Sequence, residues 1–239
     1  LAASDRERVY LEAVRSLYDG TGDLAARRRA YLEEMDALAE RYPNDEEAII
    51  FTALARMSRP DFSLENADHV VSVAAPLEEL FTERKNHPGV LHYLIHAYDS
   101  DTFARMGLRP ARLYADLAPS ASHALHMPSH IFRQLEMWER MAASNVDAYG
   151  ASVQWQKETG RPLKDRDYHS FHWLMDAYLA MEDFEGACSL IAEIDSLDEL
   201  ARERGEELGR IPSVAEEVRS QYRDRTEEVN RSVSCDPLR

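Results

Sequence analysis

Two histidine-bearing segments of this chain repeat the same spacing, one of them 34 residues after the other. The first contains His92 and His96, and the second contains His126 and His130, so each histidine has its counterpart 34 positions later. Residues four apart lie on one face of an α-helix. A period of 34 residues is typical of arrays of stacked helix pairs, in which equivalent residues come side by side. The spacing therefore predicts helical repeats and predicts that the four imidazoles converge.

Helical periodicity of apolar residues continues through almost the whole chain. Glycine is scarce, with nine in 239 residues, and alternating β-branched runs are absent. Both facts favour helix over strand. We expect an all-α array of antiparallel helix pairs, with turns at Gly20–Gly22, at Pro43–Asp45 and at Gly160–Pro162. The expected helices run from the cap at Ser4 and Asp5 to Tyr18, from 23 to 42, from Asp45 to 56, from 64 to 84, from Pro88 onward, from Pro110 onward, from Ser122 to Trp138 with a kink at Pro128, from 139 to 159, from 167 to 181 and from 184 to 194.

The last part of the chain differs in composition from the rest. After Asp195 the sequence is highly charged, and its helical patterns carry only a thin apolar stripe. A terminal repeat with a polar outer face has this character. We therefore divide the chain into a helical repeat domain, 1–194, and a charged helical cap or arm, 195–239.

Charge and composition exclude several classes of partner. The formal net charge is −16, and the only basic run, Arg27–Arg29, is followed at once by acidic residues. A phosphate-binding face needs a basic stripe, so nucleic acid is not expected as a partner. No stretch approaches the roughly 18 to 20 apolar residues that span a bilayer. Cys188 and Cys235 do not make a disulfide framework. The expected protein is soluble, and the cytoplasm and the periplasm both remain open.

Several longer strings in the sequence are chemically unusual. They are HPGVLHYLIHAYD at 87–99, ARLYADLAPSASHALHMPSHIF at 111–132, and LEMW at 135–138 followed by Asn145. Together they resemble a family of bacterial tetratricopeptide repeat (TPR) proteins, strongly over about 75–150 and more weakly over about 25–190. Typical TPR positions are occupied by Ala111, Tyr114, Ala115, Pro119, Leu135 and Trp138.

The resemblance implies a fold rather than a reaction. It implies a right-handed superhelix of helix pairs with a concave groove that binds a peptide or protein segment. Two residues depart from the pattern. Glu136 stands where such repeats usually have glycine, and His172 stands where an acidic residue is expected before Trp173.

The histidines also suggest a metal site. Two helices that each present histidines at positions i and i+4 can together supply a tetrahedral ligand set. The candidate ligands are His92, His96, His126 and His130 with Asp99, and His87 and His123 would support them from the second shell. Imidazole and carboxylate ligands suit a transition metal, Zn²⁺ above all.

Structural roles are the alternative for the same histidines. His87 and His123 are placed to cap the helices that follow them, and His126 precedes Met127-Pro128, where a carbonyl loses its donor. His169 and His172 form a further pair outside the 34-residue period. They are candidates for lining the groove, with core packing beside Trp173 as their alternative.

Three functional hypotheses follow from these observations. The leading one is a TPR-like protein whose groove binds a protein or peptide, with a histidine-rich site in that groove. The second is a metal-binding protein or metalloenzyme that uses the paired histidines, and the third is a purely structural assembly module. No glycine-rich phosphate loop and no GxSxG elbow occur, so no catalytic residue is assigned. Assembly into a homo-oligomer remains open.

Overall fold

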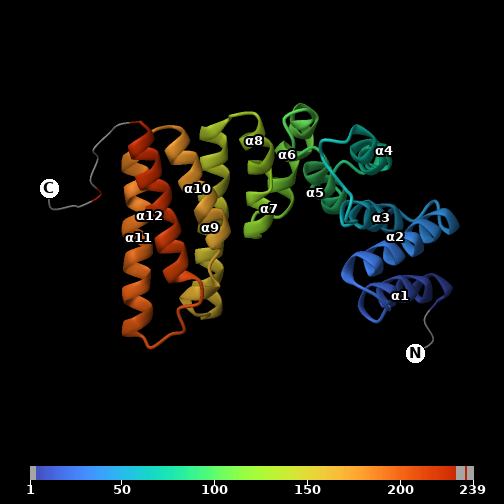
Figure 1. Ribbon diagram of the computed structural model, residues 1–239, viewed down its shortest axis with the longest axis horizontal. Helices are drawn as coiled ribbons and strands as arrows, with labels where there is room; N and C mark the ends of the chain where they lie inside the picture. The colour runs from blue at the N-terminus through green and yellow to red at the C-terminus, as the bar shows by residue number, and fades with distance from the viewer. Residues whose placement is uncertain (1–3, 230–234, 236–239) are drawn as a thin grey trace. The chain divides into compact units, whose positions relative to one another are not determined.

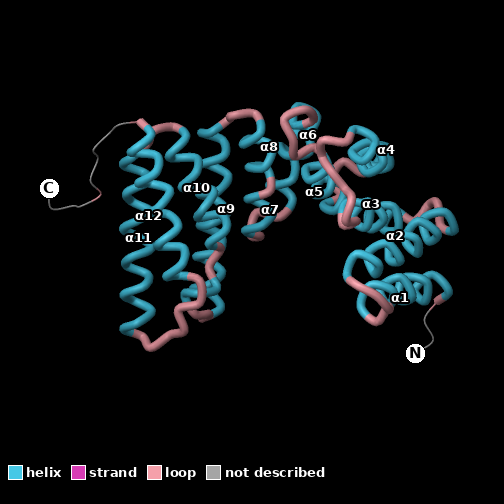
Figure 2. Tube along the Cα trace, viewed as in Figure 1, coloured by secondary structure: helices cyan, strands magenta, loops and turns pink. Residues whose placement is uncertain are grey.

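The computed structural model describes residues 4–229 and residue 235. Within those residues the regular structure is entirely helical, as Figures 1 and 2 show, and no strand occurs in them. The all-α prediction is therefore confirmed. The helices are α1 (Asp5–Tyr18), α2 (Leu24–Arg41), α3 (Glu46–Met57), α4 (Ala67–Glu83), α5 (Pro88–Ala97), α6 (Ala104–Leu117), α7 (Ser122–His126), α8 (Pro128–Gln134), α9 (Trp138–Thr159), the 3₁₀ turn η1 (Leu163–Asp165), α10 (Tyr168–Ala180), α11 (Phe184–Glu203) and α12 (Ile211–Glu228).

The chain divides into two compact units, Leu1–Leu113 and Tyr114–Arg239, and each is described by itself. The sequence predicted a different kind of division, between a repeat domain, 1–194, and a charged cap, 195–239. That boundary stays a prediction. Helix α11 runs through residue 194 without a break. None of the helices in the described part of the chain is long and apolar enough to cross a membrane.

In the first unit each helix packs against the next one along the chain, from α1 with α2 to α4 with α5. Short turns force this antiparallel arrangement, in which each helix covers the apolar face of its neighbour. One cluster of the core lies among α1, α2 and α3 and consists of Ala13, Met35, Leu38, Ala48 and Ala55.

In the second unit α7 and α8 both pack against α9, α9 packs against α10, and α10 packs against α11 and α12. Its core includes Met141, Phe171, Ile194 and Val218, which are fully buried. Phe171 of α10 meets the ring of Tyr149 of α9 edge to face, with ring centroids 5.1 Å apart. The pairs α7/α8 with α9 and α10 with α11 are thus consecutive repeats, and α12 covers the last one.

Side chains at helix starts explain most of the helix boundaries. Ser4 and Glu7 form a capping box at α1, and Asp23, Asn66, Asp167 and Asp183 accept hydrogen bonds from the first turns of α2, α4, α10 and α11. Each satisfies backbone N–H groups that have no partner within the helix.

Three expected boundaries need correction. Pro110 lies inside α6 instead of opening a helix. A proline leaves the carbonyl four residues earlier without its usual donor, and here that residue, Met106, is on the solvent side. Helix α11 extends nine residues beyond the expected end at Ile194, because Leu197 and Ala201 continue its buried face. The segment expected as one kinked helix is two helices, since α7 ends at His126 and α8 starts with Pro128.

Two turns of the second unit place a glutamate in the left-handed backbone region. Glu136 has φ 54° between α8 and α9, and Glu182 has φ 55° between α10 and α11. Around Glu136, the Met137 N–H donates to the Phe132 carbonyl and the Glu136 N–H donates to the Arg133 carbonyl, which is the Schellman pattern. Glycine is the residue that favours this position, so the departure seen at Glu136 in the sequence has a structural meaning.

The two cysteines form a disulfide bond, which the sequence did not predict. Cys188 in α11 is bonded to Cys235, with 5.1 Å between their Cα atoms. Their separation of 47 residues gave no spacing signal that would pair them. Together with α11, the bond encloses α12 in a covalent loop.

Candidate functional site

Three histidines of the second unit come together where α7, α8 and α10 meet. His126 ends α7, His130 lies in the first turn of α8, and His169 lies in the first turn of α10. One ring nitrogen from each lies within 4.8 Å of the other two. The ring centroid of His126 is 5.1 Å from that of His130 and 4.5 Å from that of His169. We refer to His126, His130 and His169 as the histidine cluster.

The ring of His126 is held in one orientation by α9. Its Nδ1 lies 2.6 Å from Oδ1 of Asn145, while Nδ2 of Asn145 donates to the Met141 carbonyl at 2.8 Å. Because the amide nitrogen of Asn145 is committed to that carbonyl, its oxygen faces the ring and accepts the hydrogen bond. Nδ1 of His126 therefore carries the proton, and Nε2 presents its lone pair.

That second nitrogen, Nε2 of His126, is buried and has no hydrogen-bond partner in the described part of the chain. The residue is 1% exposed. Burial lowers the pKa of His126 to about 4, and the bond to Asn145 opposes this shift only in part. The imidazole is therefore neutral at neutral pH, and its basic nitrogen lacks the partner that a buried polar atom ordinarily has.

Trp173 forms the floor of the cluster. Its ring centroid lies 4.9 Å from that of His126 and 4.6 Å from that of His130, and the guanidinium carbon of Arg133 lies 5.0 Å above it. The indole thus lies against the arginine as well as against both histidines. His169 is exposed, so the cluster is closed by Trp173 on one side and opens to solvent on the other.

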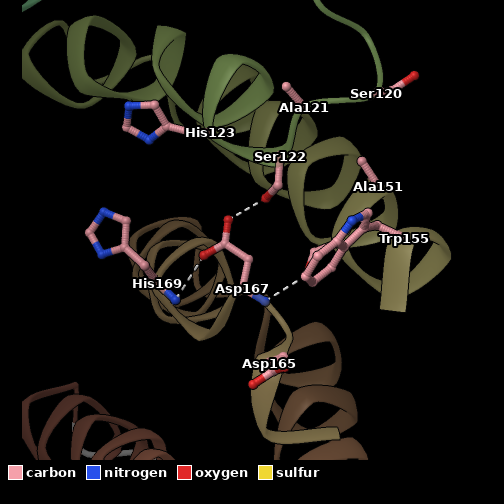
Figure 3. A pocket seen from close by; sticks show the side chains of 10 residues that line it. Ser120, Ala121, Ser122, His123, Ala151, Trp155, Asp165, Asp167 and His169 are labelled. Carbon is pink, nitrogen blue, oxygen red and sulfur yellow. Dashed lines mark hydrogen bonds between the residues drawn. The ribbon is translucent and has the colours of Figure 1, made fainter. Parts of the chain in front are cut away.

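A pocket of about 460 Å³ opens beside His169 (Figure 3). Asp167 lies in its wall, where it accepts hydrogen bonds from the hydroxyls of Ser122 and Ser170 and from the first backbone N–H groups of α10. Burial alone would raise the pKa of Asp167, but these hydrogen bonds outweigh it and the pKa is lowered. Asp167 is therefore a carboxylate that joins α7 to the start of α10.

The predicted ligands of the first half of the chain lie in the first unit. Nε2 of His92 and Nε2 of His96 are 3.1 Å apart, as expected for an i, i+4 pair on α5. Asp99 was expected one turn further along the same helix, but α5 ends at Ala97 and Asp99 follows it in the loop. Convergence of this pair with His126 and His130 stays a prediction, as does the ligand set that depends on it.

Neither of the two supporting histidines, His87 and His123, caps the helix that it was expected to cap. His87 is the N-cap residue of α5 but makes no capping hydrogen bond, and its Nε2 lies 3.3 Å from a carboxylate oxygen of Glu47. His123 lies inside α7, is exposed, and its ring centroid is 6.5 Å from that of His126. Nε2 of His172 lies 3.4 Å from a carboxylate oxygen of Glu217 in α12.

From the sequence, His169 was expected only to line the groove, whereas in the structure it belongs to the histidine cluster. It follows His126 by 43 residues instead of 34, because α9 has 22 residues and is followed by η1. Helix α10 packs on α9, and from there the side chain of His169 reaches His126 and His130 of the preceding repeat. The signal available in the sequence was a histidine in the first turn of the next predicted helix.

Stacked antiparallel helix pairs with a polar face on their first helices define a TPR-like helical-repeat protein. MamA 41-end from Desulfovibrio magneticus RS-1 is similar to it, with a TM-score of 0.59 and 14% identity, over 84% of this chain and 98% of that chain. A second MamA structure, the RS-1 ArsTM double mutant, gives 0.60 and 14%, over 86% and 100%. TTC0263, a thermophilic TPR protein of Thermus thermophilus, gives 0.54 and 13%, over 93% and 99%.

These likenesses establish the fold, and the TPR-like architecture expected from the sequence is confirmed. No family model matches the chain, and no curated protein matches it by sequence. At 13–14% identity the similarity carries no information on what this protein binds. Its function has to be argued from its own residues.

Proposed function

We propose that this protein binds a protein partner through an extended segment that lies along α10. The observation that carries the proposal is a pair of hollows at the two ends of this helix. The pocket of about 460 Å³ includes His169 at the start of α10, and a second pocket of about 540 Å³ includes Asp176, Leu179 and Ala180 at its end. The first helices of TPR-like pairs commonly supply the binding face of such arrays.

One face of α10 connects the two hollows. His169, Asp176 and Ala180 are seven and then four residues apart, which places all three on one side of a helix. His172 lies between them on the same side, against Glu217 of α12. A helix of 13 residues is about 20 Å long, which an extended segment of about six residues spans. The stripe therefore has the length of a short peptide motif.

The charges along this stripe favour a basic partner. The second pocket is lined by Asp176, Asp224 and Glu228, with Arg225 as its only cation, and the first contains Asp165 and Asp167. Several of these carboxylates already have hydrogen-bond or ion-pair partners within the chain. They therefore attract a basic segment through the negative electrostatic potential of the surface and not each through a direct contact. The overall charge of −16 adds to it. We infer a segment with lysine or arginine among its anchors.

A purely structural role for the histidines fits these observations less well. That hypothesis requires the imidazoles to be buried and hydrogen-bonded within the protein. His123 and His169 are exposed, and Nε2 of the buried His126 lacks a partner among the described residues.

Whether the protein forms a homo-oligomer is a separate question, which the molecular mass in solution, measured by light scattering, would decide.

A peptide library displayed on phage tests the proposal directly. Selection on the whole protein is expected to enrich short basic sequences, whose affinity is then measured by fluorescence anisotropy. The variant Ala180→Arg blocks the stripe, and Ala192→Arg, which makes the same change on an exposed position of α11, is the matched control. We expect at least a tenfold loss of affinity in the first variant and less than twofold in the second. Equal binding by both variants, or no enrichment over a blank surface, would overturn the proposal.

A further inference from the structure

We propose that His126, His130 and His169 bind a divalent transition-metal ion through three imidazole nitrogens, with Zn²⁺ as the best-fitting ion. This inference is independent of the peptide-binding proposal. It differs from the ligand set expected from the sequence, because His169 of the next repeat takes the third position.

The hydrogen bonding of His126 suits a metal ligand. A metal-binding histidine must offer an unprotonated nitrogen, and its other ring nitrogen usually donates to an oxygen that fixes the tautomer. His126 meets both requirements, because Nδ1 donates to Oδ1 of Asn145 and Nε2 is left with its lone pair. Asn145 is itself 0% exposed. The supporting contact is therefore as buried as the ligand it orients.

The other ring nitrogen of His126 is a buried polar atom. Nε2 of His126 lies in a residue that is 1% exposed and has no hydrogen-bond partner in the described residues. A buried polar atom of this kind ordinarily has a partner, either in the protein or in ordered water. A bound cation would provide the missing interaction at the place where the lone pair points.

The imidazoles of His130 and His169 lie close to that of His126. The three candidate nitrogens lie within 4.8 Å of one another. In a tetrahedral site with bonds of about 2.0–2.1 Å, ligand nitrogens are about 3.3 Å apart. The three nitrogens must move closer together to reach that spacing. Rotation of the His169 side chain can provide this movement, because His169 is exposed and not packed into the core. His126 would be the fixed ligand, and His169 would close onto the ion.

The choice of ion follows from the donors and from the surroundings. Three imidazoles without a thiolate suit Zn²⁺, and Cu²⁺ or Ni²⁺ less selectively, whereas Mg²⁺ and Ca²⁺ prefer oxygen ligands. Asp167 contributes a nearby negative charge that is felt at His126. His169 is exposed and lines the neighbouring pocket, so solvent would reach the ion from the side of this ligand. Three histidines with one open position form a site of Lewis-acid type.

The test uses untagged protein that has been stripped with a chelator. Zn²⁺ is titrated calorimetrically, and Co²⁺ is used as a spectroscopic probe, since its visible absorption intensifies in tetrahedral imidazole coordination. We expect one ion per chain. The variant His169→Ala should weaken binding at least tenfold without unfolding the protein, because the removed side chain is exposed. The matched control His172→Ala, on the same helix and facing Glu217, should bind as the wild type does.

The remaining outcomes separate this site from others on the chain. His126→Ala should abolish binding as well, with its fold verified by circular dichroism, while His92→Ala should leave binding intact. If His92→Ala abolishes binding and His169→Ala does not, the ion is held elsewhere and the assignment is wrong. Wild-type protein that binds no ion, or that binds it no more tightly than His169→Ala does, would also overturn it.

Discussion

Oδ1 of Asn145 accepts a hydrogen bond from Nδ1 of His126 over 2.6 Å, and this contact determines which nitrogen of the imidazole faces its neighbours. The two residues are 19 positions apart and lie on opposite members of a helix pair, α9 and α7. Both are almost completely buried. The contact is therefore a property of the repeat packing, and its loss should be measurable in the stability of the second unit.

Replacing Asn145 with alanine should be strongly destabilising. The change removes the acceptor of the buried His126 Nδ1–H and the side-chain donor to the Met141 carbonyl, and the expected loss is about 1 to 3 kcal/mol. Val146→Ala on the same helix is the control, since Val146 is 47% exposed and such surface changes stay within about 0.5 kcal/mol. Urea unfolding followed by circular dichroism measures both variants. Similar losses of unfolding free energy in the two variants would mean that the buried hydrogen bond contributes no more to stability than an exposed side chain does.

Glu136→Gly should stabilise the protein. The backbone of Glu136 is left-handed, with φ 54°, which costs a residue with a Cβ roughly 1 kcal/mol or more and costs glycine almost nothing. Part of the gain is offset by the greater freedom of glycine in the unfolded chain. The melting temperature should therefore rise.

Glu139→Gly, three positions later in the first turn of α9, is the control for that change. Glycine in a helix costs about 1 kcal/mol relative to good helix formers. The same substitution should thus have opposite signs at two neighbouring positions. A fall in melting temperature for both variants would show that the turn is not strained.

Asp167→Ala should destabilise the second unit more than Asp183→Ala does. Both aspartates cap a helix, but Asp167 accepts from two backbone N–H groups and from the hydroxyls of Ser122 and Ser170, whereas the cap at Asp183 is a single bond to Gly186. Losing a cap costs about 0.5 to 2 kcal/mol, and we expect Asp167 near the upper end and Asp183 near the lower. Denaturant midpoints of the two variants give the comparison, and the reverse order would contradict it.

Reduction of the disulfide should lower the stability of the protein considerably. The bond between Cys188 and Cys235 closes a loop over a separation of 47 residues, for which the chain-entropy model gives about 4 kcal/mol. A thiol reagent should find no free thiol in the denatured, unreduced protein and two after reduction. Cys235→Ser is the control, because its stability should not respond to reductant. A wild type that is equally insensitive would show that the cysteines are not paired in solution.

The contribution of Asp45 to stability should disappear in acid. Arg6 donates hydrogen bonds to the Asp45 carboxylate and lowers its pKa below the ordinary value, and Tyr10 donates a further bond. A carboxyl whose pKa is lower in the folded state stabilises the fold above the unfolded pKa, which is about 3.9 for aspartate. That stabilisation is lost as the pH falls through the folded pKa.

Urea midpoints of Asp45→Asn and of the wild type should therefore differ most at neutral pH and converge in acid. Asp61→Asn is the control, because the Asp61 side chain is 73% exposed in its ion pair with Arg59 and such pairs add little. A difference between Asp45→Asn and the wild type that persists unchanged below the folded pKa would contradict this account.

The sequence predicted the helices well and the site only in part. Apolar residues at helical spacing and capping side chains such as Ser4 are local signals, and they placed most helices within a few residues. The same periodicity put His126 and His130 near one another correctly. Asp99 lies in the loop after α5, which ends at Ala97, so the helical spacing expected for it does not hold, while its place in the ligand set stays a prediction.

The rest of the site depends on contacts between distant segments. His169 reaches the cluster because of the length of α9, which fixes how α10 stacks but leaves no fixed period in the sequence. The role of Asn145 depends on which way its amide points, and that is decided by the Met141 carbonyl one turn earlier. The pairing of Cys188 with Cys235 likewise depends on where the chain returns after α12.

The disulfide also makes the two ends of the helix array unequal. A stack of helices opens from its ends, because an end helix has a neighbour on one side only. At the N-terminal end α1 packs chiefly on α2 and has no covalent link among the described residues. At the other end α12 lies within the loop closed by Cys188 and Cys235, so it cannot move far from α11 while the bond is intact. We therefore expect α1 of the first unit to separate from its neighbour more readily than α12 of the second unit does, as long as the disulfide is intact.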